Sequence, residues 1–155
     1  TDRIFFIDFG IQVDDDSVSH VVSKRDDYHV MVFPGVTEGI DWDVFKDKVS
    51  QKSSEPTHQM GLNFDTEIGN QVSENVYTVK TSSARSWFML CKPTLKYIKC
   101  RRTGKLKISP KSDAMFENFK ESGVKVVAFT GARLTFTYPH ECIGNIVNSA
   151  GVKAN

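Results

Sequence analysis

The fold is decided by residues 76–109, which read VYTVKTSSARSWFMLCKPTLKYIKCRRTGKLKIS. Apolar and β-branched residues recur there in short runs, and the residues between the runs are typical of turns. The pattern predicts four short strands, at residues 76–79, 87–91, 95–101 and 105–109. The last two are joined at Arg102-Thr103-Gly104, where glycine can take a positive φ. Consecutive short strands of this kind indicate a β-meander.

Strands and helices are mixed on both sides of this stretch. Further strands are expected at 3–11, 28–33, 58–64, 124–130 and 134–138, and helices at 14–22, 41–51, 109–123 and 140–150. The segment 14–22 also fits a strand, because it is rich in β-branched residues. Apart from the strand at 58–64, residues 52–75 are polar and are expected to form loops. Since the elements do not alternate strictly, the sequence predicts an α+β fold, an antiparallel-rich mixed sheet of about seven short strands with three to four short helices.

Length and composition favour one ordinary domain. A chain of 155 residues can bury one core but not two, so a single domain over residues 1–155 is expected. Its 39% hydrophobic and 25% charged residues exclude collagen-like, low-complexity and disordered classes. The three cysteines do not form a disulfide framework, which favours a cytoplasmic or otherwise intracellular setting. No apolar run is long enough for a membrane span or a signal peptide, so no membrane partner is expected.

The net charge of +1 conceals an acidic half and a basic half. Residues 1–79 carry six Lys and Arg against fifteen Asp and Glu, whereas residues 80–155 carry fourteen against four. No acidic residue occurs between Glu74 and Asp113, a window that holds ten Lys and Arg. Such segregation is typical of a chain that meets a polyanion or a partner of opposite charge. Alternatively, the two halves fold against each other and their charges cancel.

The basic window contains the candidate binding site. On a strand at 95–101 alternate side chains share a face, so Tyr97, Lys99 and Arg101 would lie together, with the cations of the returning strand beside them. An aromatic ring can stack on an unpaired base while cations hold the phosphates, as single-stranded nucleic acid requires. Alternatively, the ring of Tyr97 is half-buried in the core, and the lysines prevent the edge of the strand from pairing with another strand. The candidate nucleic-acid-binding residues are Lys96, Tyr97, Lys99, Arg101, Arg102, Lys105 and Lys107.

Motifs for catalysis are weak. Several acids lie near the first strand, namely Asp2, Asp8, Asp14, Asp15 and Asp16. An aspartate at such a strand end is where some nucleases bind a metal ion, although a helix cap explains it as well. Phosphate loops, paired histidine ligands and nucleophile motifs are absent from the sequence, and Cys91 and Cys100 are expected to be buried and inert. The sequence therefore assigns no catalytic residue, no metal site and no cofactor.

Residues 4–10, Ile-Phe-Phe-Ile-Asp-Phe-Gly, resemble a strand of tudor-type domains, which bind methylated ligands through an aromatic cage. The resemblance covers seven of the 155 residues and carries over no cage residue.

Three functions from different classes follow from these patterns. The first is a non-enzymatic binding module whose basic β-hairpin face docks a polyanion, either nucleic acid or an acidic protein surface. The second is a structural subunit that forms homo-oligomers by contact between acidic and basic faces. The third is a metal-dependent nuclease that uses Asp8 and its neighbours. The charge pattern favours the first.

Overall fold

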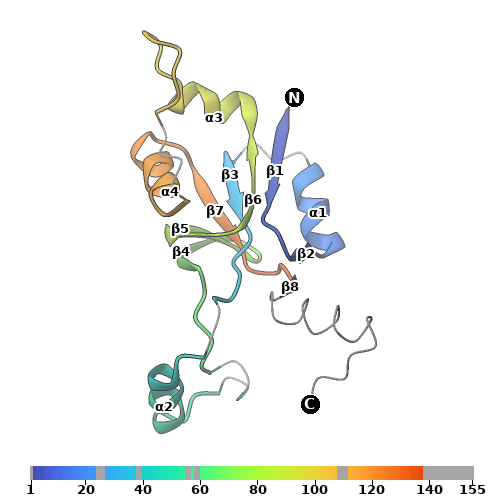
Figure 1. Ribbon diagram of the computed structural model, residues 1–155, viewed down its shortest axis with the longest axis vertical. Helices are drawn as coiled ribbons and strands as arrows, with labels where there is room; N and C mark the ends of the chain where they lie inside the picture. Colours follow the sequence, from blue (N-terminus) through green and yellow to red (C-terminus); the bar gives the residue numbers. More distant parts are fainter. Residues whose placement is uncertain are drawn as a thin grey trace, which may run out of the picture.

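The computed structural model describes residues 2–23, 27–37, 40–54, 57, 60–107 and 112–137. Within these residues the chain forms eight strands and four helices (Figure 1). The strands are β1 (Arg3–Ile7), β2 (Ile11–Val13), β3 (Val30–Val32), β4 (Thr66–Ser73), β5 (Val76–Ser82), β6 (Ser86–Leu90), β7 (Val126–Phe129) and β8 (Leu134–Phe136). The helices are α1 (Asp15–Val22), α2 (Trp42–Ser50), α3 (Cys91–Ile98) and α4 (Ser112–Glu121). The predicted α+β fold is confirmed.

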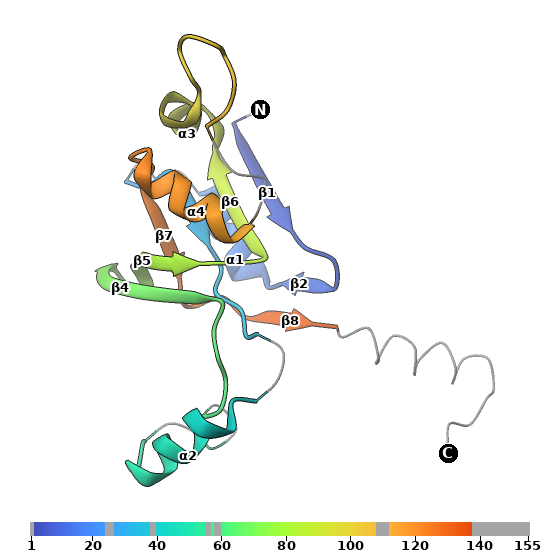
Figure 2. The same cartoon turned by 60° about the vertical axis from the view of Figure 1, so that its left-hand side comes forward.

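Six strands form one sheet in the order β1-β6-β3-β7-β5-β4. β3 and β7 are parallel, and all other neighbours in this sheet are antiparallel. β2 and β8 form a separate antiparallel pair. Figure 2 shows α4 in front of the large sheet and α1 behind it. Because helices cover both faces of the sheet, every residue of the central strand β3 is buried.

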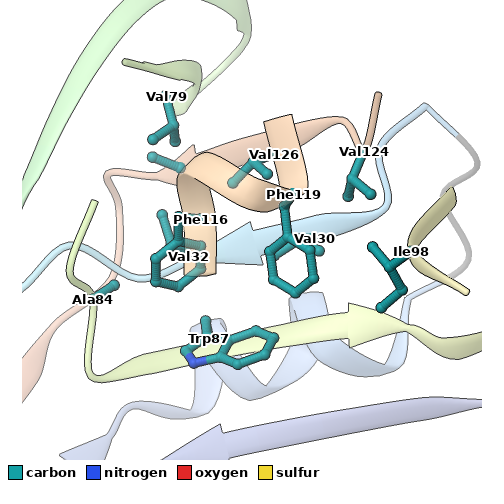
Figure 3. Close-up of a cluster of buried hydrophobic side chains, with 11 residues drawn as sticks. Val30, Val32, Val79, Ala84, Trp87, Ile98, Phe116, Phe119, Val124 and Val126 are labelled. Atoms are coloured by element: carbon teal, nitrogen blue, oxygen red, sulfur yellow. The ribbon is translucent and has the colours of Figure 1, made fainter. Parts of the chain in front are cut away.

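Alternate residues of the strands supply two apolar clusters, one on each face of the sheet. The first and last residues of β3 face α4, whereas Met31 between them belongs to the cluster on the α1 side. On the α4 side, Phe116 and Phe119 pack edge-on against Trp87 of β6, with ring centroids 5.5 and 5.9 Å apart (Figure 3). Burial of these three large rings fixes α4 on the sheet.

Three of the helices have capping residues in the described part of the chain, whereas Ser109, the predicted N-cap of the helix at 109–123, lies outside it. The carboxylate of Asp14 accepts a hydrogen bond from the N–H of Ser17 and caps α1. Asp41 caps α2 in the same way, accepting from the N–H of Val44 at 3.0 Å. Gly123 follows α4 at φ +85°, a conformation that favours glycine. The helices predicted from these signals are confirmed, and the strand alternative for α1 is excluded.

α3 replaces the strand predicted at 95–101. The buried residues of α3 are Cys91, Thr94 and Ile98, which recur at helical spacing. Pro93 lies in the first turn, where the N–H that proline lacks would have no helical partner. The strand prediction was wrong because it rested on residues 95–101 alone, whereas the helical spacing becomes visible only when the buried residues Cys91 and Thr94 are included.

Other predictions also require correction. The strand expected at 58–64 is wrong over 60–64, where Phe64 makes only an isolated bridge to Val36. β4 lies instead at residues expected to form a loop. In the strand expected at 105–109, the described residues contribute only the bridge of Leu106 to Lys99. The helix expected at 140–150 lies outside the described residues.

α2 and α3 lie at opposite ends of the molecule (Figure 1). α2 stands away from the sheet, and none of its residues is fully buried. Among the helices in the described ranges, none has the length and apolar character needed to pass through a bilayer.

Candidate nucleic-acid interface

The basic tip, defined as residues 92–107, comprises most of α3 and the loop after it. It stands at the end of the molecule opposite α2 (Figure 1). All seven residues predicted to bind nucleic acid lie in it, and all seven are exposed: Lys96, Tyr97, Lys99, Arg101, Arg102, Lys105 and Lys107. The structure therefore gathers the predicted residues at one end, on a helix and a loop rather than on two strands.

Backbone hydrogen bonds hold the loop of the basic tip in a defined shape. The N–H of Lys107 donates to the C=O of Ile98 at 2.7 Å, and the N–H of Cys100 donates to the C=O of Lys105 at 2.8 Å. Gly104 has the predicted positive φ, at +69°, and turns the chain between them. Because the loop is closed at its base, its cations project from an ordered turn.

Tyr97 does not share a face with the cations that alternation on a strand would place beside it. Successive residues of a helix are rotated by about 100°, so Tyr97 and Lys99 point to nearly opposite sides of α3. The ring of Tyr97 lies against the ring of His29, with centroids 4.9 Å apart and planes tilted by 37°. Burial and the charge of Lys125 lower the pKa of His29 below its ordinary value, so this neighbour is neutral at pH 7. The expected aromatic platform among the cations is therefore not formed.

A cleft of about 580 Å³ opens on the other side of α3. Its lining residues are Leu95, Lys96, Lys99, Cys100, Arg101 and Gly104. The helical rotation that turns Tyr97 away brings Leu95, Lys96 and Lys99 together on this side. Three cations and the apolar side chain of Leu95 therefore share one concave surface, an arrangement suited to an anion with an apolar part.

Among the described residues, the acidic half supplies an ion-pair partner to one cation of the basic tip, Lys92. Lys92 lies 4.0 Å from a carboxylate oxygen of Asp2, and both side chains are exposed. Lys80, outside the tip, pairs with Glu67 at 2.8 Å. For the six cations among the predicted binding residues, no carboxylate of a described residue lies within ion-pair distance.

Several carboxylates of the acidic half are engaged by backbone N–H groups elsewhere. Asp8 accepts from the N–H of Phe9 at 2.8 Å. Asp65 accepts from the N–H of Gly35 at 3.0 Å, and burial raises the pKa of this carboxyl.

Residues 40–54, at the end of the molecule opposite the basic tip, have no net charge. Residues 40–54 hold three Lys, at 46, 48 and 52, and three Asp, at 41, 43 and 47. Within residues 40–54, acidic side chains therefore do not outnumber basic ones.

Cys100 is a feature of the site that the sequence did not reveal. Cys91 is buried, as expected, but Cys100 is partly exposed in the cationic cleft. Hydrogen bonds from the side chain and N–H of Thr103 and the N–H of Arg102, with the charge of Lys107, lower the pKa of the Cys100 thiol to about 7. The sequence signal was indirect: a cysteine beside a turn glycine in a run of cations.

The acids considered for a metal site do not form one group. Asp2 and Asp8 lie beyond opposite ends of β1, and Asp14 caps α1. Over the described ranges, no three His, Cys, Asp or Glu side chains are placed to hold a metal ion. Comparisons with known protein families, curated proteins and solved structures find no match to this chain.

Proposed function

We propose that this domain is a binding module that holds nucleic acid by its phosphates through the basic tip. The observation that carries the proposal is the group of six exposed cations without a carboxylate partner among the described residues. Cations on an ordered, protruding surface can replace the counterions of a polyanion, and the released counterions drive binding.

The chemistry of the cleft favours contacts with phosphate over recognition of bases. Its lining contains no aromatic ring on which bases could stack and no amide side chain of the kind that reads adenine. Lysine and arginine hold phosphate oxygens without sequence information. We therefore expect binding that depends little on sequence and weakens steeply with salt.

The test is a salt titration with fluorescein-labelled oligonucleotides followed by fluorescence anisotropy. The double variant Lys99→Gln with Arg101→Gln removes two cations of the cleft. Each lost phosphate contact lowers the slope of log affinity against log salt by about 0.7 to 0.9. The double variant should therefore lower that slope by about 1.5 and weaken binding at low salt by about tenfold.

The matched control is Lys46→Gln with Lys52→Gln, which removes the same charge from the opposite end of the molecule. It should leave both the affinity and the slope unchanged. Equal losses in the two double variants would mean that net charge alone attracts the oligonucleotide. No binding by the unaltered chain at low salt would remove the proposal.

The two other functions have less support. Assembly through acidic and basic faces requires an acidic surface that complements the tip, and residues 40–54 at the opposite end hold equal numbers of Lys and Asp. A nuclease requires converging carboxylates, and Asp2 and Asp8 lie beyond opposite ends of a strand. Light scattering over a salt series and a magnesium-dependent cleavage assay, respectively, test these two alternatives.

A further inference from the structure

No strand within the described ranges pairs with the outer side of β1. β1 ends the six-stranded sheet and pairs only with β6 among the described strands. The C=O of Asp2 accepts from the first residue of α3 at 2.9 Å, and the N–H of Asp8 donates to the residue before β6, also at 2.9 Å. In an antiparallel ladder, alternate residues turn their backbone groups to the same side. Arg3, Phe5 and Ile7 therefore turn their N–H and C=O groups outward.

The other edge of the sheet is protected and β1 is not. The pairing of β4 with β5 shifts register at three places, and Glu67 of β4 forms an ion pair with Lys80. β1 keeps an unbroken register with β6 and contains neither proline nor lysine. Its one cation, Arg3, donates to the backbone C=O of Val21 in α1. Irregular, charged edges resist pairing, whereas regular apolar ones invite it.

Exposed apolar side chains border this edge on both faces of the sheet. On the α4 side Phe6 is 38% exposed and stacks on Trp87, with ring centroids 4.1 Å apart. On the α1 side Ile7 is 49% exposed. A groove of about 710 Å³ lies between the second half of β1 and residues 83–87, on the side of β1 that pairs with β6.

α1 adds two more exposed apolar side chains above this edge. Val21 is buried against the sheet, and a rotation of about 100° per residue places Val18 and Val22 on one flank of α1 and His20 on the other. The ring of His20 lies 4.0 Å from that of Phe129 on β7, toward the middle of the sheet. Val18 and Val22, 40% and 71% exposed, therefore point toward the β1 edge.

We propose that β1 pairs with β1 of a second copy of this chain, antiparallel and across a two-fold axis at Phe5. The outward residues Arg3, Phe5 and Ile7 are symmetric about Phe5, so Arg3 of each copy would lie opposite Ile7 of the other. Every outward N–H and C=O then gains a partner. The same axis brings the two α1 helices side by side.

The exposed valines favour a second copy over an unrelated extended peptide. A peptide strand would satisfy the backbone groups of β1 but would leave Val18 and Val22 in water. In a second copy related by this axis, α1 lies on the same face of the joined sheet as α1 of the first copy. The two helices therefore cover each other's exposed valines. The contact is short, and it places Asp2 opposite Asp8 of the other copy. We therefore expect a reversible dimer, which Asp8→Asn should tighten because the substitution removes a repulsion between like charges.

The test is sedimentation equilibrium of the 155-residue chain from low micromolar to sub-millimolar concentration. Ile7→Pro removes an outward N–H without touching the β1–β6 ladder, and Ile7→Thr is its control because it keeps that N–H. Val22→Lys places a charge at the contact between helices, and Ser19→Lys places one on the solvent side of α1. Ile7→Pro and Val22→Lys should each weaken dimerisation by about tenfold or more, and the two controls by much less.

Either of two results would overturn the proposal: an unaltered chain that stays monomeric throughout, or a dimer that persists in both Ile7→Pro and Val22→Lys. Circular dichroism shows whether each variant is folded. Because Val22 is highly exposed, its substitution provides the answer even where proline at position 7 disturbs the strand.

Discussion

The side chain of Thr103 forms a hydrogen bond with the sulfur of Cys100 in the loop of the basic tip. Since hydrogen bonds to a thiolate favour the ionised form, this contact is the main reason that the pKa of Cys100 falls from 9.0 to about 7. The thiol is therefore about half ionised at neutral pH and lies among the cations of the cleft.

Removing the hydroxyl should return the Cys100 pKa toward its ordinary value. In Thr103→Val the midpoint of the pH dependence of alkylation should rise from about 7 toward 9.0, because only the backbone N–H groups and the charge of Lys107 still favour the thiolate. The rate of iodoacetamide modification at Cys100, followed by peptide mass spectrometry, measures this midpoint. Thr103→Ser keeps the hydroxyl and should keep the midpoint. An unchanged midpoint in Thr103→Val would show that the side-chain hydrogen bond is unimportant.

Tyr97 should contribute little to nucleic-acid binding, although it lies within the basic tip. Stacking of a base on an aromatic ring is worth about 1–3 kcal/mol, so losing it would weaken binding by about fivefold or more. The ring of Tyr97 packs on His29, across the helix from the cleft. We expect Tyr97→Leu to change the anisotropy-derived Kd for a single-stranded oligonucleotide by less than about twofold. A loss of about tenfold, with Tyr97→Phe normal, would mean that bases reach this side of α3.

The contrast between Tyr97 and the cations shows how far the sequence could predict the site. The charge pattern identified the basic segment that the structure places at one end of the molecule, because the absence of acids from residues 75–112 is a property of the chain and not of its fold. The grouping of side chains within that segment depends on whether the backbone repeats every two residues or every 3.6 residues. The strand interpretation therefore grouped Tyr97 with Lys99, and the helix separates them.

The elements of the fold that could be predicted are those whose burial leaves a clear apolar pattern in the sequence. β3 and β7 are buried on both faces and are apolar throughout, so their residues identify them as strands. β4, with the sequence TEIGNQVS, lies at an edge with most side chains exposed, so its pairing with β5 leaves no apolar pattern. Cys100 illustrates a further limit, since its pKa depends on a hydrogen bond that the folded loop creates.

Asp14 should stabilise the fold more than its neighbouring acids do. Besides capping α1, its carboxylate accepts from the N–H of Arg133 at 3.0 Å, which ties the helix to the loop before β8. We expect Asp14→Ala to lower the free energy of unfolding by about 1–2 kcal/mol in urea, and Asp15→Ala by much less. An equal loss in the two variants would contradict a special role for the cap.

The stabilisation that Asp14 gives to the folded state should weaken as the pH falls. Burial acts to raise the pKa of Asp14, but hydrogen bonds from the Ser17 hydroxyl and from the N–H groups of Arg133 and Ser17 outweigh it, and the pKa is lowered from 3.8. A carboxyl with a lowered pKa in the folded state stabilises that state above the ordinary pKa and loses the effect on acidification. The difference between the unaltered chain and Asp14→Ala should therefore be full at pH 7 and shrink below about pH 3.8.

Ionisation of the Asp65 carboxyl should have the opposite effect and destabilise the folded state. Burial raises its pKa above 3.8, although hydrogen bonds from the N–H of Gly35 and the hydroxyl of Thr66 and the charge of Arg85 oppose the rise. The folded state therefore binds this proton more tightly than the unfolded state, and stability falls as pH rises from 3.8 through the raised pKa. Asp65→Asn removes the charge and keeps an oxygen that can accept both hydrogen bonds. It should match the unaltered chain below pH 3.8 and be more stable at pH 7.

The expected gain requires that Arg85 does not depend on Asp65 for its position. The guanidinium of Arg85 lies 4.7 Å from the centroid of the Phe136 ring, a contact that the substitution leaves in place. Asp65→Ala serves as the comparison, because it removes the acceptor as well as the charge and should cost about 1–3 kcal/mol even below pH 3.8. Urea unfolding at a series of pH values separates the two variants. If Asp65→Asn is less stable than the unaltered chain at pH 7, the attraction of Arg85 outweighs the burial of the charge.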